Sequence, residues 1–287
     1  MSNEMMSVFQ KSVSGLPVPA SLFYRDPDGL NGIGSTWNTL RRNNIGTRQV
    51  ETLFRKQAEY GSRGMTFLIY HASDPECVCN PFLGKPSAVQ ILSRLAVWNL
   101  GYDDTELMRW KGILLAGKQP GICLVPSIFC GDDRATMQNE EFCNWFLPQA
   151  VFGLYEYSVG FNLGSEVGKS LGKDGMRQRV LTMKRTFDIM HLAPKPIFIH
   201  NQGWDIPEEA DGLFYEMSYN PNDGKDYSVA FVIDEIKDVL QHLPKHQMLG
   251  IVEMDIDPET GLSVDKTRKI VELAESEPRI VWLPGPV

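Results

Sequence analysis

The chain has 287 residues, of which 43% are hydrophobic and 22% are charged, as in an ordinary globular protein. Its net charge of −8 argues against a nucleic-acid partner, because affinity for nucleic acid depends largely on Lys and Arg side chains that neutralise phosphates. No apolar run reaches the roughly 18 residues that a membrane span needs, and residues 1–20 lack the basic and apolar regions of a secretory signal, so we expect cytoplasmic synthesis and no membrane partner.

Eight segments are predicted to be strands, because each is an apolar run bounded by glycine, proline or polar residues. They cover residues 18–24, 64–71, 121–129, 154–164, 195–201, 212–219, 247–256 and 279–283. Segments with helical spacing of their apolar residues separate most of the strands, at 47–62, 86–102, 104–117, 139–153, 173–190, 226–244 and 264–278. The segment that begins at 139 is expected to be helical only until Pro148, and the connection between the fifth and sixth strands is short.

The apolar runs are continuous rather than alternating, which is typical of parallel strands that are buried on both faces. Eight such strands with intervening helices predict a single α/β domain over residues 1–287, a (β/α)8 TIM barrel with residues 1–17 as an N-terminal extension. The alternative is an open doubly wound sheet, although no G-x-G-x-x-G motif follows the first strand. The barrel is predicted to lack a final helix, so residues 2–15 or another subunit should cover the outer face of the first and last strands.

Acidic and aromatic residues gather at the predicted carboxyl ends of the strands, where barrel enzymes place their active sites. The candidates, in strand order from the fourth to the eighth, are Glu166, then His200, Asn201 and Trp204, then Glu216 and Tyr219, then Glu253, and finally Trp282. Paired carboxylates suit the hydrolysis of glycosidic bonds, since one acid protonates the leaving oxygen while the other stabilises or attacks the anomeric carbon. Aromatic rings present apolar faces to sugars.

Each candidate also has a structural interpretation. A glutamate that follows a strand is usually a solvated loop residue, and a satisfied structural histidine explains His200 about as well as a functional one. Glu216 and Glu253 differ because they lie inside apolar runs, where an ionised carboxylate needs a partner or a polar cavity. No metal or cofactor is expected, because the chain has no H-E-x-x-H motif and its Cys77-Val78-Cys79 stretch lacks a second Cys/His pair.

The layout resembles the clan A retaining glycoside hydrolases, which are (β/α)8 barrels. Glu166 in FNLGSE and Glu253 in GIVEMD stand at the ends of the fourth and seventh strands, where that family carries its acid/base and its nucleophile. The resemblance implies those catalytic roles for these two residues, with Glu216 as a reserve for either role. It also implies that Trp282 in VWLPG is a sugar platform, and that His200 and Tyr219 are similar to the polar residues of strands five and six.

The chain departs from the family pattern directly before the acid/base, where the family has Asn and this sequence has Ser165, with Asn162 four residues before Glu166. The early-strand Arg of the family has no counterpart except Arg25. Two functions are therefore carried forward. The first is hydrolysis of a poly- or oligosaccharide by two carboxylates. The second is a non-catalytic glycan-binding or structural barrel, as a homo-oligomer or within a larger assembly such as a virus particle.

Overall fold

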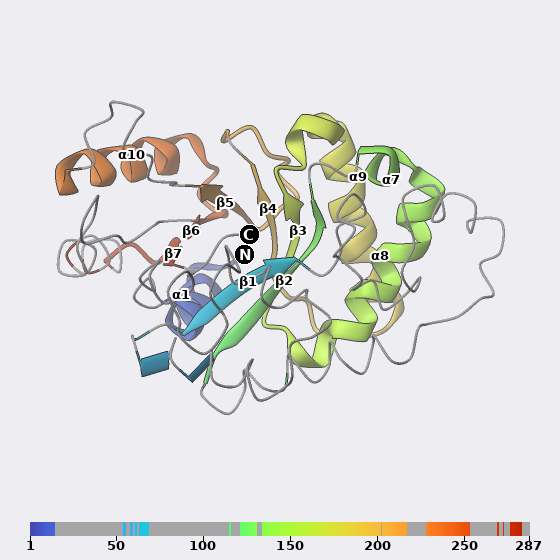
Figure 1. Ribbon diagram of the computed structural model, residues 1–287, viewed down its shortest axis with the longest axis horizontal. Helices are drawn as coiled ribbons and strands as arrows, with labels where there is room; N and C mark the ends of the chain where they lie inside the picture. The colour runs from blue at the N-terminus through green and yellow to red at the C-terminus, as the bar shows by residue number, and fades with distance from the viewer. Residues whose placement is uncertain are drawn as a thin grey trace, which may run out of the picture.

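The computed structural model describes residues 1–14, 63–68, 121–130, 134–201, 203–216, 228–252 and 276–282, together with residues 54–55, 58–59, 61, 115, 269 and 272. In this part of the chain seven parallel strands form one sheet, and their order in the sheet is their order in the sequence (Figure 1). The strands are β1 (Gly64–Leu68), β2 (Cys123–Cys130), β3 (Phe161–Ser165), β4 (Ile197–His200), β5 (Gly212–Glu216), β6 (Met248–Val252) and β7 (Ile280–Trp282).

The helices and the 3₁₀ turn that are described from end to end are α1 (Asn3–Val13), α7 (Arg134–Gln138), α8 (Glu140–Leu154), η2 (Tyr155–Tyr157), α9 (Gly168–Ile189) and α10 (Val229–His242); residues 54–55, 58–59, 115, 269 and 272 are also helical. Figure 1 shows α8 and α9 side by side on the right, next to β3, and α10 on the opposite side of the molecule, near β5. Each of these three helices buries apolar side chains in one shared core with the strands. Among the described residues, no helix is long and apolar enough to cross a membrane.

Alternate residues of the strands face the two sides of the sheet, as the strand period of two requires. In β4, Ile197 and Ile199 join the core beneath the helices, whereas Phe198 belongs to a second cluster on the opposite side. Phe198 stacks on Phe214 of β5 with ring centroids 4.4 Å apart. Gly250 of β6 makes this packing possible, because a Cβ atom there would lie 2.2 Å from the Phe214 ring. The second cluster therefore fills the hollow of the curled sheet.

Helix α1 lies in this hollow, between the two ends of the sheet (Figure 1). The Ser2 hydroxyl caps the helix by accepting a hydrogen bond from the Met5 N–H (3.3 Å), and Phe9 stacks on Phe198 at 5.4 Å. The helix also binds residues that precede strands: Gln10 Nε2 donates to the Glu277 carbonyl (3.0 Å), and Arg63 donates to the Lys11 carbonyl (3.1 Å). The expectation that residues 2–15 cover an outer face was wrong, because the apolar stripe of α1 fits the aromatic interior.

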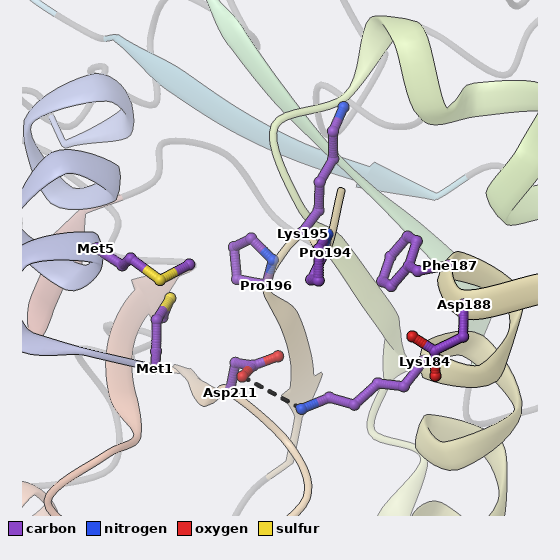
Figure 2. A pocket seen from close by; sticks show the side chains of 9 residues that line it. All are labelled: Met1, Met5, Lys184, Phe187, Asp188, Pro194, Lys195, Pro196 and Asp211. Atoms are coloured by element: carbon purple, nitrogen blue, oxygen red, sulfur yellow. Dashed lines mark hydrogen bonds and ion pairs between the residues drawn. The ribbon is translucent and has the colours of Figure 1, made fainter. Parts of the chain in front are cut away.

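A cavity of about 330 Å³ separates α1 from the C-terminal end of α9 (Figure 2). Met5 of α1 and Met1, which precedes that helix, form one wall, and Phe187 lies on the other side with Pro194 and Pro196. The Lys184 ammonium lies 3.3 Å from Asp211 Oδ1 at the edge of this cavity. Asp211 and Pro196 directly precede β5 and β4, so the cavity lies at the amino ends of the strands, opposite the end where barrel enzymes place their active sites.

The connection from β4 to β5 has no helix, as its short length predicted. Residues 203–211 instead are held to α9 by three ion pairs along that helix. The pairs are Lys173–Asp205 (2.6 Å), Arg177–Glu209 (2.5 Å) and Lys184–Asp211 (3.3 Å). Exposed ion pairs contribute only about 0–1 kcal/mol each, so they fix the path of this segment more than they stabilise the protein.

The predicted strand at 154–164 was wrong in its first half. Helix α8 continues through Pro148 to Leu154 and is followed by the 3₁₀ turn, so β3 begins only at Phe161. The Asn139 side chain caps the helix by accepting a hydrogen bond from the Phe142 N–H (2.8 Å). Burial of one continuous apolar face of α8 outweighs the single backbone hydrogen bond that a proline removes. Trp145 on this helix is half-buried against the core.

The remaining predicted elements agree with the structure to different extents. The strands predicted at 64–71, 195–201, 212–219, 247–256 and 279–283 contain β1, β4, β5, β6 and β7, and the strand predicted at 121–129 matches β2 except that β2 ends one residue later, at Cys130. The helix predicted from 173 matches α9 after its break at Gly172, which has φ 62°. The strand at 18–24 and the helices at 86–102 and 104–117 lie outside the described residues, apart from residue 115, and those at 47–62 and 264–278 are described at only a few positions. The fold is thus α/β with a curled parallel sheet of the TIM-barrel type.

Candidate active site

Glu166 stands directly after β3, in the turn that leads into α9. Its backbone has φ 51°, the left-handed conformation that residues with a side chain seldom adopt. A glycine would occupy this turn without strain. Strained backbone tends to persist at functional sites, where the surrounding structure compensates for it. Glu166 is therefore a candidate functional residue, with its carboxylate at the carboxyl end of a central strand.

The Glu166 carboxylate is paired with Lys169 in the first turn of α9. The Lys169 Nζ lies 3.0 Å from Glu166 Oε1, and the two side chains are 49% and 32% exposed. Both groups are therefore accessible to a ligand at the carboxyl end of β3. Lys169 was not among the predicted site residues, although its position three residues after a glutamate at a helix start is a recognisable pattern.

His200 ends β4 and is fully buried. Burial, with a smaller contribution from the positive charge of Lys169, lowers the pKa of His200 to about 3. Glu216 Oε2 lies 3.9 Å from His200 Nε2, and a carboxylate at that distance would favour a charged imidazole. At this distance the attraction is weaker than the desolvation cost of a fully buried charge, so the imidazole is neutral at physiological pH.

Glu216 ends β5 and faces the hollow of the sheet. The preceding residue, Tyr215, points the other way, because its hydroxyl donates to Glu235 Oε1 of α10 (3.0 Å). Burial, together with the Glu235 carboxylate, raises the pKa of Tyr215 to about 12, so this phenol stays neutral. The Glu216 side chain is 24% exposed, which leaves it open to solvent at the carboxyl end of the strand.

Four polar side chains thus stand at the ends of β3, β4 and β5, and we call them the polar cluster. They form two pairs, Glu166 with Lys169 (3.0 Å) and His200 with Glu216 (3.9 Å). Three of the four residues were predicted from the sequence. The cluster presents two carboxylates, one ammonium and one neutral imidazole, which is a set able to transfer protons and to bind hydroxyl groups.

Two further predicted residues lie in the segment that follows β4. Asn201 is half-buried, and its Nδ2 donates to the Gly203 carbonyl (3.2 Å). Its Oδ1 lies against α9 so closely that a Cβ at Gly168 would be 2.3 Å away. Trp204 is 44% exposed and stacks on His242, the last residue of α10, with ring centroids 4.3 Å apart. One face of the indole is therefore covered by the imidazole.

The other predicted site residues are not placed by the structure. Glu253 and Tyr219 lie outside the described residues, and the side chain of Trp282 does as well, although its backbone ends β7. Glu253 directly follows Val252, the last residue of β6.

Comparison with known proteins gives matches only at the level of structure. No protein-family model matches this chain, and no curated protein sequence matches it. Among solved structures, a glycoside hydrolase family 5 enzyme from Prevotella bryantii, in complex with a xyloglucan tetradecasaccharide, matches with a TM-score of 0.60 and 11% identity, over 97% of this chain and 90% of that one. A β-mannanase from the blue mussel Mytilus edulis matches with a TM-score of 0.54 and 10% identity, over 95% and 90% of the two chains.

A broad-specificity endoglucanase from Clostridium acetobutylicum is a third similar structure, with a TM-score of 0.52 and 11% identity over 97% of this chain and 88% of that one. All three matches cover nearly the whole of both chains. At such low identity they establish the fold and leave the chemistry to the residues of this chain. The chain has the TIM-barrel-like fold of these glycoside hydrolases.

Proposed function

We propose that the protein is a glycoside hydrolase that cleaves a poly- or oligosaccharide with two carboxylates. The polar cluster of Glu166, Lys169, His200 and Glu216 carries this proposal. It lies at the carboxyl ends of parallel strands, in a fold that the similar structures use for glycan hydrolysis. Accessible carboxylates at this end of the sheet are the groups that glycosidic hydrolysis requires.

In this proposal Glu166 is the acid/base and Glu253 is the nucleophile. Glu166 gives its proton to the glycosidic oxygen while Glu253 attacks the anomeric carbon, so that the leaving sugar departs and a glycosyl ester forms. Glu166 then removes a proton from water, which attacks the ester and frees Glu253. Lys169 must release Glu166 when the substrate binds, since the carboxylate has to gain a proton. Glu216 is the reserve for either carboxylate.

The remaining predicted residues would bind the sugar chain. The neutral imidazole of His200 is fully buried, so it would contribute to sugar binding by orienting the adjacent Glu216 carboxylate. Asn201 and Tyr219 add polar groups, and the rings of Trp204 and Trp282 would lie against sugar faces. Because the similar structures include a xyloglucan complex, a mannanase and an endoglucanase, β-linked glucans and mannans are the first substrates to test.

The second candidate function is a glycan-binding or structural barrel without catalysis. The Glu166–Lys169 ion pair is the observation that favours it, because a general acid must carry a proton and a carboxylate in an ion pair does not. A binding module would retain sugar chains on the same surface and release no products. The two functions therefore differ in turnover and not in the location of the site.

Turnover of aryl β-glycosides, xyloglucan and β-mannan by the whole chain distinguishes the two functions. We expect hydrolysis by the wild type and none by Glu253→Gln. Glu166→Gln should slow poly- and oligosaccharide hydrolysis by about a hundredfold or more, but should slow aryl glycosides least when their leaving group needs no proton. The control is Glu141→Gln, an exposed glutamate on α8, which should behave as wild type. Sugar binding without hydrolysis by the wild type would support the binding module instead.

A further inference from the structure

Strands β3 and β4 separate before either of them ends. They pair only at Phe161 with Ile197 and at Asn162 with Phe198. Beyond that point β3 continues along β2, where Gly164 pairs with Phe129. Strand β4 continues along β5, where His200 pairs with Phe214. The carboxyl ends of β3 and β4, which carry Glu166 and His200, are therefore not joined by backbone pairing.

The side chain of Asn162 bridges the separated strands. Its Oδ1 accepts a hydrogen bond from the Gly164 N–H on its own strand (3.2 Å) and another from the His200 N–H on β4 (3.1 Å). Its Nδ2 donates to the Ser127 hydroxyl on β2 (3.0 Å). Asn162 and Ser127 are both fully buried. One amide group thus connects three strands, and its oxygen serves two backbone N–H groups that would otherwise be buried without an acceptor.

We infer that Asn162 is a positioning residue that holds the two sides of the candidate active site at a fixed separation. On one side it fixes the Gly164 backbone, two residues before Glu166. On the other side it fixes the backbone of His200. The catalytic part of this inference rests on the proposed function, but the structural part does not. Asn162 touches neither carboxylate, so it acts only through the backbone that carries them.

The chemistry of the side chain makes this inference testable. A leucine at 162 has nearly the same shape but leaves the buried Gly164 and His200 N–H groups without an acceptor. An aspartate keeps the acceptor oxygen, and the Ser127 hydroxyl can rotate to donate to its second oxygen. Ser127→Ala is the matched control, because it removes a hydrogen bond from the same network but leaves both backbone N–H groups bound.

Amide hydrogen exchange of the intact chain tests the structural part. We expect the Gly164 and His200 amide protons to exchange slowly in the wild type, and about tenfold to a hundredfold faster in Asn162→Leu. Asn162→Asp and Ser127→Ala should keep most of the protection. Rapid exchange of both amides in the folded wild type would overturn the inference even if Asn162→Leu fails to fold, as would unchanged exchange in Asn162→Leu.

Hydrolysis kinetics with the same variants test the catalytic part. Asn162→Leu should lower kcat by about a hundredfold with little change in KM, since small misplacements of reacting groups have effects of that size. Asn162→Asp should recover most of kcat, and Ser127→Ala should stay within about threefold of wild type. Equal kcat values for wild type and a folded Asn162→Leu overturn the positioning role. A wild type without turnover, but with the expected exchange pattern, overturns the proposed function and leaves the structural part intact.

Discussion

Glu166 combines an unusual backbone conformation with the side chain that the proposed function requires. The apolar strand β3 ends in Gly164-Ser165, and the next residue adopts a left-handed backbone while presenting its carboxylate to Lys169. A sequence selected for stability alone would place glycine at such a position. Retention of a glutamate there is consistent with a residue kept for its side chain, as in other proteins that balance stability against function.

The backbone strain at Glu166 predicts an order of stabilities. Glu166→Gly and Glu166→Ala both remove the ion pair with Lys169, so they differ only in what the backbone requires. Since alanine is strained at φ 51° and glycine is not, the glycine variant should be more stable by about 1 kcal/mol. Urea unfolding of the two variants measures this difference. If the alanine variant is equal or more stable, the left-handed conformation is not maintained in solution.

The buried His200 predicts a pH dependence of stability. Its pKa is about 3 in the folded protein and about 6.5 when unfolded, so the unfolded chain binds the extra proton between these values. The contribution of the neutral His200 to the free energy of unfolding is complete above about pH 6.5 and falls as the pH drops toward 3. From about pH 7 to about pH 5 the wild type should therefore lose about 2 kcal/mol more than His200→Gln, by urea unfolding at both pH values. If the free energy of unfolding falls equally in the two proteins, the pKa of His200 is not lowered by folding, and the histidine is charged in the folded protein at pH 5.

At the scale of elements, helix α1 is predicted to be an integral part of the barrel interior. Phe9 is 8% exposed and stacks on Phe198, whereas its neighbour Val8 is 61% exposed. Phe9→Ala should lower the free energy of unfolding by about 3 kcal/mol, because it leaves a cavity among aromatic rings. Val8→Ala is the control on the same helix and should change the free energy of unfolding by less than about 0.5 kcal/mol. A small effect of Phe9→Ala would show that α1 does not dock in solution.

The elements also show what the sequence could and could not reveal. The run Ile197–Ile199 predicted β4 correctly, because a short apolar segment bounded by prolines and a polar residue has few alternatives. The strand predicted from Leu154 was wrong although the signal for a helix was present. Cys143, Leu147, Ala150 and Leu154 recur at helical spacing and are all buried in α8. This periodicity continues past Pro148, so it predicts the end of α8 better than the proline does.

The candidate site could be predicted only in part for a physical reason. Glu166, His200 and Glu216 stand at strand ends, so a correct fold class was enough to bring them together. Lys169 and Asn162 were missed as site residues because their roles depend on contacts between elements. The acceptor role of Asn162 exists only where β3 and β4 separate, and no local pattern in the sequence encodes that separation.

At the scale of the whole molecule, the parallel sheet, the three helices on its outer side and α1 in its hollow give a TIM-barrel-like fold shared with family 5 glycoside hydrolases. Two further statements remain predictions: that residues 1–287 form a single domain, and that copies of the chain associate. The central proposal is chemical: two carboxylates would cleave a glycan, with Glu253 as the nucleophile.

Trapping of the glycosyl-enzyme tests this claim most directly. Aryl glycosides with fluorine in place of the 2-hydroxyl and a good leaving group react in the first step but turn over slowly, because contacts to the 2-hydroxyl that strengthen the transition state are lost. The whole chain is incubated with gluco-, manno- and xylo-configured reagents and digested, and its peptides are analysed by mass spectrometry. We expect one sugar on the peptide that contains Glu253 in the wild type, and no sugar on that peptide in Glu253→Gln. A label on Glu166 or Glu216, or no label from any reagent, would contradict it.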